Sequence, residues 1–267
     1  MDIIEKITGN ISENTACWNA VESAIEECGV DIPEGTPKTD YADKVAEVFE
    51  AGKKSEYDAF WDEFQQNGNR TDYKYAFGGC GWNADTFKPK YKIAPTVAYD
   101  SFRDFNNNAH GDEIVMDMSN IEIDFSNITD ATNIFNSAFI KNLFCDFGNV
   151  TTAYYALGSA HGGFCDNITI RISEKCTNLS YMFAYQGASE TLVFTEDSVI
   201  AANLNVRWST KLNRRSIESI VNALSTTTTG LSVTLSSTAV TNAFGSVDNV
   251  EWKALVESKP NWTISLV

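Results

Sequence analysis

The chain has 267 residues, 43% of them hydrophobic and 21% charged, and a formal net charge of −16. Such a composition is typical of a folded protein with a sizeable core and excludes a disordered chain. The negative charge repels phosphate groups, so nucleic acid and membrane surfaces are not expected as partners. No apolar run reaches the roughly 18 residues of a membrane span, and Met1–Lys6 lacks the features of a signal peptide. The location stays open between a virion and a cell surface.

Residues 1–36 are expected to form a separate helical segment. Its apolar residues follow alternating steps of three and four, and only Asn14 interrupts them. They are Ile4, Ile7, Ile11, Trp18, Val21, Ile25 and Cys28. This pattern fits two short amphipathic helices. It also fits a short coiled coil that would join copies of the chain into a homo-oligomer, with Asn14 setting the register.

Residues 37–112 are expected to form a helical and aromatic cap. A helix can begin at Thr39 or Asp40 and end near Gly68, which suits a left-handed stop. The following residues 70–112 are irregular and rich in aromatic side chains. Such a segment would cover the open end of a repeat array. Its rings could alternatively stack on sugars.

Residues 113–267 contain the most informative pattern, a short repeat. Asp124–Thr129 recurs 22 positions later as Asp146–Thr151. Apolar side chains alternate through each unit, and the last inward residues fall at regular intervals. These residues are Phe125, Phe147, Ile172 and Phe194, at intervals of 22, 25 and 22. The period predicts an α/β fold in which a leucine-rich-repeat-like solenoid carries a parallel β-sheet around one shared core.

The two ends of this repeat region are less regular. The first strand has two placements, because Asp117–Ile121 resembles Asp124–Ile128. Near the C-terminus a helical pattern precedes a strand pattern twice. The helices are expected at about 217–224 and 250–256, and the strands at 231–235 and 262–267. Units of this kind predict right-handed crossovers onto the same parallel sheet.

Parts of the chain resemble known proteins. Asp124–Thr129, Asp146–Thr151 and Cys176–Phe183 resemble the irregular bacterial leucine-rich-repeat surface proteins called BspA-like, over about half of the chain. Residues 53–95 and the ending Asn261–Leu266 are similar to uncharacterised proteins of phages and prophages from gut Firmicutes. These resemblances imply a solenoid that serves as a phage tail or bacterial surface component.

One face of the predicted sheet is the candidate binding surface. Alternation along the strands points every second side chain away from the core. The outward residues are Glu122, Asp124, Phe144, Asp146, Thr169, Arg171, Val193 and Thr195. Solenoids commonly bind through such an extended face, and Phe144 would be an exposed ring suited to a partner contact. We therefore expect this column to bind a protein or a glycan.

Catalytic motifs are not evident in the sequence. The two histidines, His110 and His161, have no metal-binding spacing, and Gly78–Gly81 lacks the lysine of a phosphate-binding loop. The six cysteines form no C-x-x-C pair, which predicts free thiols without zinc, and Cys145 is expected to be a small buried apolar side chain. We expect a non-enzymatic protein without metal or cofactor.

The alternative is a carbohydrate-active enzyme, a lyase or glycosidase, on the same parallel solenoid. Glu122 and Asp124 would lie two apart on one strand, and Asp146 would lie beside Asp124 one coil later. Paired carboxylates of this kind perform acid–base chemistry on glycans. They could also gather a weakly bound calcium ion. A solvated acidic column is the simpler interpretation and is preferred.

Overall fold

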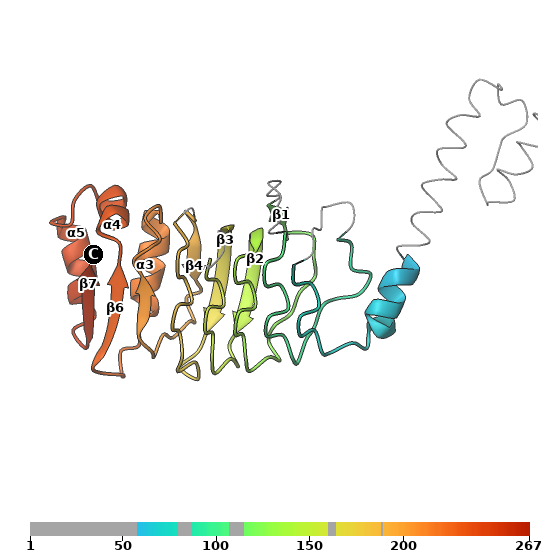
Figure 1. Ribbon diagram of the computed structural model, residues 1–267. Helices are drawn as coiled ribbons and strands as arrows, with labels where there is room; N and C mark the ends of the chain where they lie inside the picture. Colours follow the sequence, from blue (N-terminus) through green and yellow to red (C-terminus); the bar gives the residue numbers. More distant parts are fainter. Residues whose placement is uncertain (1–57, 80–86, 107–114, 160–163, 188) are drawn as a thin grey trace, which may run out of the picture. The chain divides into compact units, whose positions relative to one another are not determined.

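The computed structural model describes residues 58–79, 87–106, 115–159, 164–187 and 189–267. The chain divides into two compact units, Met1–Glu63 and Phe64–Val267. Residues 58–64 are helical. The expected helical segment 1–36, with its coiled-coil alternative, lies outside the described residues. The second unit is a mixed α/β solenoid with parallel β-sheets, as the repeat predicts (Figure 1).

The first sheet takes one strand from each of four neighbouring coils. β1 (Met116–Asp117), β2 (Phe139–Phe147), β3 (Phe164–Ile172) and β4 (Leu192–Phe194) pair in parallel in the order β1-β2-β3-β4. Leu143 and Cys145 of β2 pair with Ile168 and Ile170 of β3, and all four side chains are buried. Removing this apolar surface from water, at about 25 cal/mol per Å², stabilises the stack of coils.

Three of the four expected core residues form one row. The ring centroids of Phe125 and Phe147 lie 6.1 Å apart, and Phe147 pairs with Ile172 across β2 and β3. Phe194 pairs instead with Ile170, so the expected interval of 22 residues was wrong at this step and the true offset is 24. A shift of two residues returns an apolar side chain to the core, so the alternating pattern cannot distinguish these two registers.

Both placements of the first strand occur within one coil. Asp117 lies in β1 and pairs with Lys141 near the start of β2. Farther along, Ile123 forms a single parallel bridge with Ile93 of the preceding coil. Phe125 then packs against the last residue of β2. The two similar stretches of sequence therefore occupy successive positions along the same coil.

A second ladder runs through the turns that follow the strands. Within a coil, every second N–H bonds to a carbonyl three residues earlier, as from Ser101 N to Ala98 O (3.1 Å) and from Phe105 N to Phe102 O (3.1 Å). Between coils, Phe102 N donates to Ile134 O (2.9 Å). We call this arrangement the turn ladder; it comprises residues 73–79, 98–106, 131–138, 153–159 and 179–187. Its equivalent core residues, all fully buried, are Phe77, Phe102, Phe135, Leu157 and Phe183.

One position of the turn ladder has a left-handed backbone in all five of these coils, with φ between 53° and 59°. The residues there are Tyr75, Asp100, Asn133, Tyr155 and Tyr181. Asn and Asp adopt this conformation at modest cost, but a bulky residue seldom does. Because three of the five residues are tyrosines, this regular turn structure could not be predicted from the residue types.

The stacking of coils begins before residue 113. Phe77 N donates to Ser101 O (2.8 Å), and Ile93 bridges Ile123. The boundary expected between the aromatic cap and the solenoid therefore falls inside the stacked region. The phenylalanines Phe77, Phe87, Phe102 and Phe105 of this stretch supply core, because rings such as Phe77 and Phe102 (centroids 4.8 Å apart) pack on one another inside the coils.

A buried glutamine marks the start of the second unit. The Gln65 side chain donates from Nε2 to Tyr91 O (2.8 Å) and accepts from Tyr91 N (2.9 Å). The short 3₁₀ helix η2 (Gln66–Gly68) follows. Gly68 has a φ of 85°, the left-handed conformation expected there, but it ends η2, because the preceding helix already ends at residue 64. An added Cβ at Gly68 would lie 3.1 Å from the Tyr91 ring, so the close approach also favours glycine.

The C-terminal elements build a second sheet. They are β5 (Leu204–Val206), α3 (Arg214–Ala223), β6 (Leu231–Leu235), α4 (Ser237–Phe244), α5 (Val250–Glu257) and β7 (Trp262–Leu266). β5, β6 and β7 pair in parallel, separately from β1–β4, so the expectation that all strands join the same sheet was wrong. The two expected helices and two expected strands are confirmed as α3, α5, β6 and β7. α4 was not expected; its N-cap is Ser236, and it ends at the left-handed Gly245.

The first sheet ends at β4 because α3 packs against that strand. A helix uses its own backbone groups internally and cannot continue a strand ladder. Serine side chains of α3 instead accept hydrogen bonds from the backbone N–H groups of β4. Leu192 N donates to Ser216 Oγ and Phe194 N to Ser219 Oγ, both at 3.1 Å. The solenoid therefore changes from strand to helix on this side.

Candidate functional site

The apolar part of the expected outward column is a row of three residues. Phe144, Thr169 and Val193 pair across β2, β3 and β4. Phe144 is 48% exposed, as expected for the open face, but Val193 is only 8% exposed. Val193 belongs to β4, against which α3 packs, so the open face ends before this residue. Phe144 is therefore the exposed aromatic side chain of this row.

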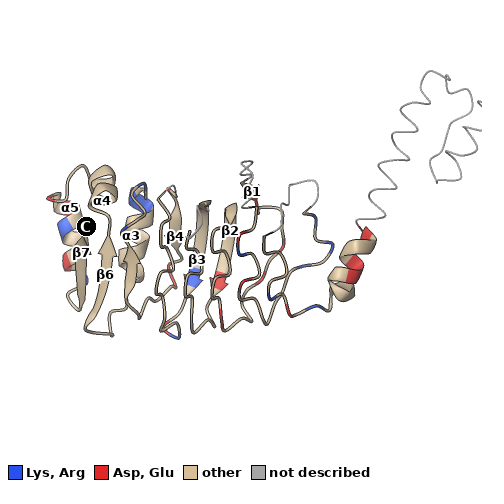
Figure 2. Ribbon diagram, viewed as in Figure 1, with Lys and Arg blue, Asp and Glu red and all other residues tan. Residues whose placement is uncertain are grey.

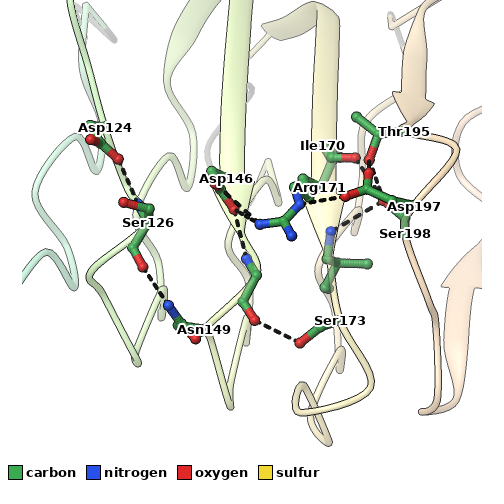
Figure 3. A network of polar contacts seen from close by, with 12 residues as sticks. Asp124, Ser126, Asp146, Asn149, Ile170, Arg171, Ser173, Thr195, Asp197 and Ser198 are labelled. Atoms are coloured by element: carbon green, nitrogen blue, oxygen red, sulfur yellow. Dashed lines mark hydrogen bonds and ion pairs between the residues drawn. The ribbon is translucent and has the colours of Figure 1, made fainter.

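The polar part of the column is a chain of ion pairs (Figure 3). Arg171 lies opposite Asp146, with Nη1 3.1 Å from Asp146 Oδ1 and Nε 2.7 Å from Asp197 Oδ2. Thr195 donates its hydroxyl to Asp197 (2.6 Å). This hydrogen bond and the contact with Arg171 lower the pKa of Asp197. Asp197 was missed by the sequence analysis because it follows β4 in a turn, where strand alternation does not apply.

Asp124 also has a cationic partner. Lys92 Nζ lies 2.7 Å from Asp124 Oδ2. The hydrogen bond from Lys92, with that from Ser126, lowers the pKa of Asp124 to about 2. Glu122 and Asp124 do not lie on a strand as expected; they flank Ile123, which makes a single bridge. Two acidic residues of the expected column, Asp124 and Asp146, thus form ion pairs with Lys92 and Arg171.

The repeated Asp-Phe motif has a structural reason. Asp124 Oδ1 accepts from Ser126 N, and Asp146 Oδ1 accepts from Gly148 N, both at 3.0 Å. Each aspartate thereby closes a local turn that contains the inward phenylalanine that follows it. Asn149 Nδ2 donates to Ser126 O of the preceding coil (2.8 Å), which fastens the two turns together (Figure 3). Among the residues with described positions, no three His, Cys, Asp or Glu side chains form a metal-binding group.

A second group of aromatic residues, exposed or half-buried, lies on and beside the turn ladder. We call it the tyrosine surface; it consists of Tyr154, Tyr155, Tyr181, Tyr185 and Trp208. Tyr155 and Tyr181 stack with centroids 4.8 Å apart and planes inclined by 10°, and Tyr154 meets Tyr181 edge-on at 5.9 Å. Tyr185 and Trp208 continue the series at 5.0 Å. Desolvation, with Tyr154 nearby, raises the pKa of Tyr155.

The tyrosine side chains of this surface reach solvent although their neighbours in the chain are buried. Tyr181 is 46% exposed and Tyr185 is 56% exposed, whereas Met182 and Phe183 between them are buried. The turn ladder thus directs the two tyrosines to solvent and the side chains between them into the core. The sequence did contain a signal, because Tyr155 and Tyr181 are 26 residues apart, the same offset as the bridge between Thr152 and Asn178.

A pocket of about 350 Å³ adjoins this surface. Its lining residues are Leu179, Ser180, Tyr181, Asn203, Leu204, Asn205, Arg207, Trp208, Ser232 and Thr234. Asn203 Oδ1 accepts from Ser232 N (2.8 Å), and Asn205 Oδ1 accepts from Arg207 N (3.2 Å). Both amide oxygens are thus held by the protein, which directs the two amide NH₂ groups as donors.

The neighbouring sheet adds small neutral side chains. Asn205, Thr234 and Ser265 form one row across β5, β6 and β7, while Val233 and Leu235 are buried beneath. β6 and β7 contain no charged residue (Figure 2). Hydroxyl and amide side chains therefore continue from the pocket across β5, β6 and β7.

Comparison with protein-family models, with curated proteins and with solved structures gives no match. None of the helices in the described ranges is both long and apolar enough to cross a bilayer.

Proposed function

We propose that this solenoid is a non-enzymatic recognition module that binds a glycan along the tyrosine surface. The observation that carries the proposal is a row of aromatic rings across successive coils, from the stacked Tyr155 and Tyr181 to Tyr185 and Trp208, beside a pocket of amide and hydroxyl groups. Tyr181 and Tyr185 are exposed, and Tyr155 and Trp208 are half-buried. The resemblances found in the sequence suggest that the module serves a phage tail or a bacterial surface.

The chemistry of this face suits sugars. Tyrosine and tryptophan offer large, rigid contact surfaces that lose little conformational entropy on binding. Such rings can cover the apolar face of a pyranose. Asparagine, serine and threonine supply the donors and acceptors that sugar hydroxyls need. The rigid turn ladder beneath Tyr181 holds the rings in place before a ligand arrives, which lowers the ordering cost of binding.

The ion pairs of the strand face favour binding over catalysis. A general acid must carry a proton near the working pH. The Lys92 ammonium instead keeps the pKa of Asp124 at about 2, so this carboxyl stays ionised. Asp146 is engaged by Arg171. These contacts support the non-enzymatic proposal and weigh against a glycosidase built on this column.

The test is a glycan array followed by titration calorimetry with the best ligand. Trp208→Ala and Tyr181→Ala are each expected to weaken binding about 30-fold, because truncating a central aromatic anchor costs about 2 kcal/mol. Phe144→Ala removes an exposed ring from the strand face and is the matched control; its affinity is expected to stay within about twofold.

Other results would overturn the proposal. Loss of binding in Phe144→Ala with full binding in Trp208→Ala would move the site to the strand face. Binding to no glycan, together with capture of a protein through Trp208, would show a protein-recognition module. Steady release of sugar products would show an enzyme.

A further inference from the structure

Arg207 is the charged residue of the pocket, and its guanidinium is available to a ligand. The guanidinium carbon lies 4.1 Å from the centroid of the Trp208 ring. Within the described part of the chain, no carboxylate lies within ion-pair distance of Arg207. Arg171 and Arg214, by contrast, each contact two carboxylates. A guanidinium held over a ring keeps its N–H groups at its rim, where they can meet a ligand.

The charge around the pocket differs from that of the whole chain. The net charge of the protein is −16, yet residues 201–267 contain six Lys and Arg side chains and four Asp and Glu side chains. The pocket lining contains no carboxylate. The strands beside it, β6 and β7, are neutral (Figure 2). An anionic group would therefore meet attraction at Arg207 and little local repulsion.

We infer that this pocket binds an acidic sugar whose carboxylate pairs with Arg207, an inference that rests on the proposed glycan-binding function. A planar carboxylate matches the fork of N–H donors on a guanidinium and can accept two hydrogen bonds at once. The Tyr181 ring would cover the sugar ring, and the Trp208 ring would hold the guanidinium beside it. The amide NH₂ groups of Asn203 and Asn205 would donate to neighbouring oxygens.

The ligand is expected to carry isolated rather than dense negative charge. The protein as a whole repels polyanions, because its field is strongly negative. A single uronic acid in a mostly neutral glycan would gain the contact with Arg207 without bringing many repelled charges close to the surface. This distinguishes the inferred ligand from highly sulfated or fully acidic polysaccharides.

The test uses three tetrasaccharides that differ at one sugar. This sugar is glucuronic acid, the methyl ester of glucuronic acid, or glucose 6-sulfate. The methyl ester keeps the ring and removes the charge. The acid is expected to bind about tenfold to a hundredfold more tightly than the ester, because charge-assisted hydrogen bonds are worth more than neutral ones. Arg207→Gln is expected to abolish this preference, so that the acid and the ester bind the variant within about twofold of each other.

The controls separate the two proposals. Arg215→Gln removes the same charge from an exposed position of α3 and is expected to leave the preference unchanged. Equal binding of acid and ester to the wild type, or a preference that survives in Arg207→Gln, would refute the role of Arg207 alone. Tighter binding of the sulfate than of the acid would overturn the carboxylate assignment. If none of the three binds, or if Trp208→Ala changes nothing, the proposed function itself fails.

Discussion

The junction between β4 and α3 offers a direct test of how the solenoid changes from strand to helix. Ser216→Ala removes the oxygen that accepts a hydrogen bond from Leu192 N (3.1 Å). Leu192 lies in β4 and is fully buried. An unsatisfied buried N–H costs about 1–3 kcal/mol. The Ser216 hydroxyl also lies within hydrogen-bond distance of Glu190 O (3.2 Å) and Asn213 Oδ1 (3.0 Å). We therefore expect a loss of about 2 kcal/mol in the free energy of unfolding, or about 4–8 °C in Tm for a unit of this size.

Urea unfolding measures the global effect, and hydrogen exchange of the Leu192 amide measures the local one. The matched control is Ser258→Ala, which removes an exposed hydrogen bond to Leu255 O (2.6 Å) at the end of α5. This control should change stability by no more than about 0.5 kcal/mol. If Ser216→Ala is as stable as Ser258→Ala and the Leu192 amide exchanges at its original rate, then the serine does not terminate the sheet as argued.

Three further outcomes are expected. Phe147→Ala should lower the free energy of unfolding by about 3–5 kcal/mol, because its ring is fully buried, whereas Phe144→Ala on the same strand should cost less than about 1 kcal/mol; equal costs would contradict the inward row. The Lys92 contact lowers the pKa of Asp124 to about 2 from its usual 3.8, so its stabilising effect is full above pH 3.8 and is lost as the pH falls toward 2. The stability gap between wild type and Asp124→Asn, followed by urea unfolding from pH 5 to pH 2, should therefore narrow, and a constant gap would show that this pairing is absent. Burial raises the pKa of the Cys165 thiol to about 12, so iodoacetamide at pH 8 should label it only in urea; rapid labelling of the folded protein, read by peptide mass spectrometry, would contradict its burial.

Much of the strand side of the solenoid follows from short-range pattern. Alternation of apolar residues gives β2 and β3, and the repeated Asp-Phe turn gives the spacing between Phe125 and Phe147, because both patterns depend on neighbours only a few residues apart in the chain. The helices α3 and α5 follow from their periodicity and caps for the same reason. The ionic partners Lys92 and Asp197 could not be found in this way, since each reaches an aspartate or arginine in another coil.

Tertiary packing settled the remaining features. Alternating apolar residues leave a two-residue slip undetected, so only the packed core distinguishes Ile170 from Ile172 as the partner of Phe194. Strand and helix patterns do not state which sheet a strand joins; the packing of α3 on β4 separates β5–β7 from the first sheet. The exposed tyrosines depend on left-handed turns that bulky residues rarely adopt alone, and neighbouring coils hold these turns through long-range backbone hydrogen bonds. Local sequence therefore determined the coil, and contacts between coils determined the surface that we propose for binding.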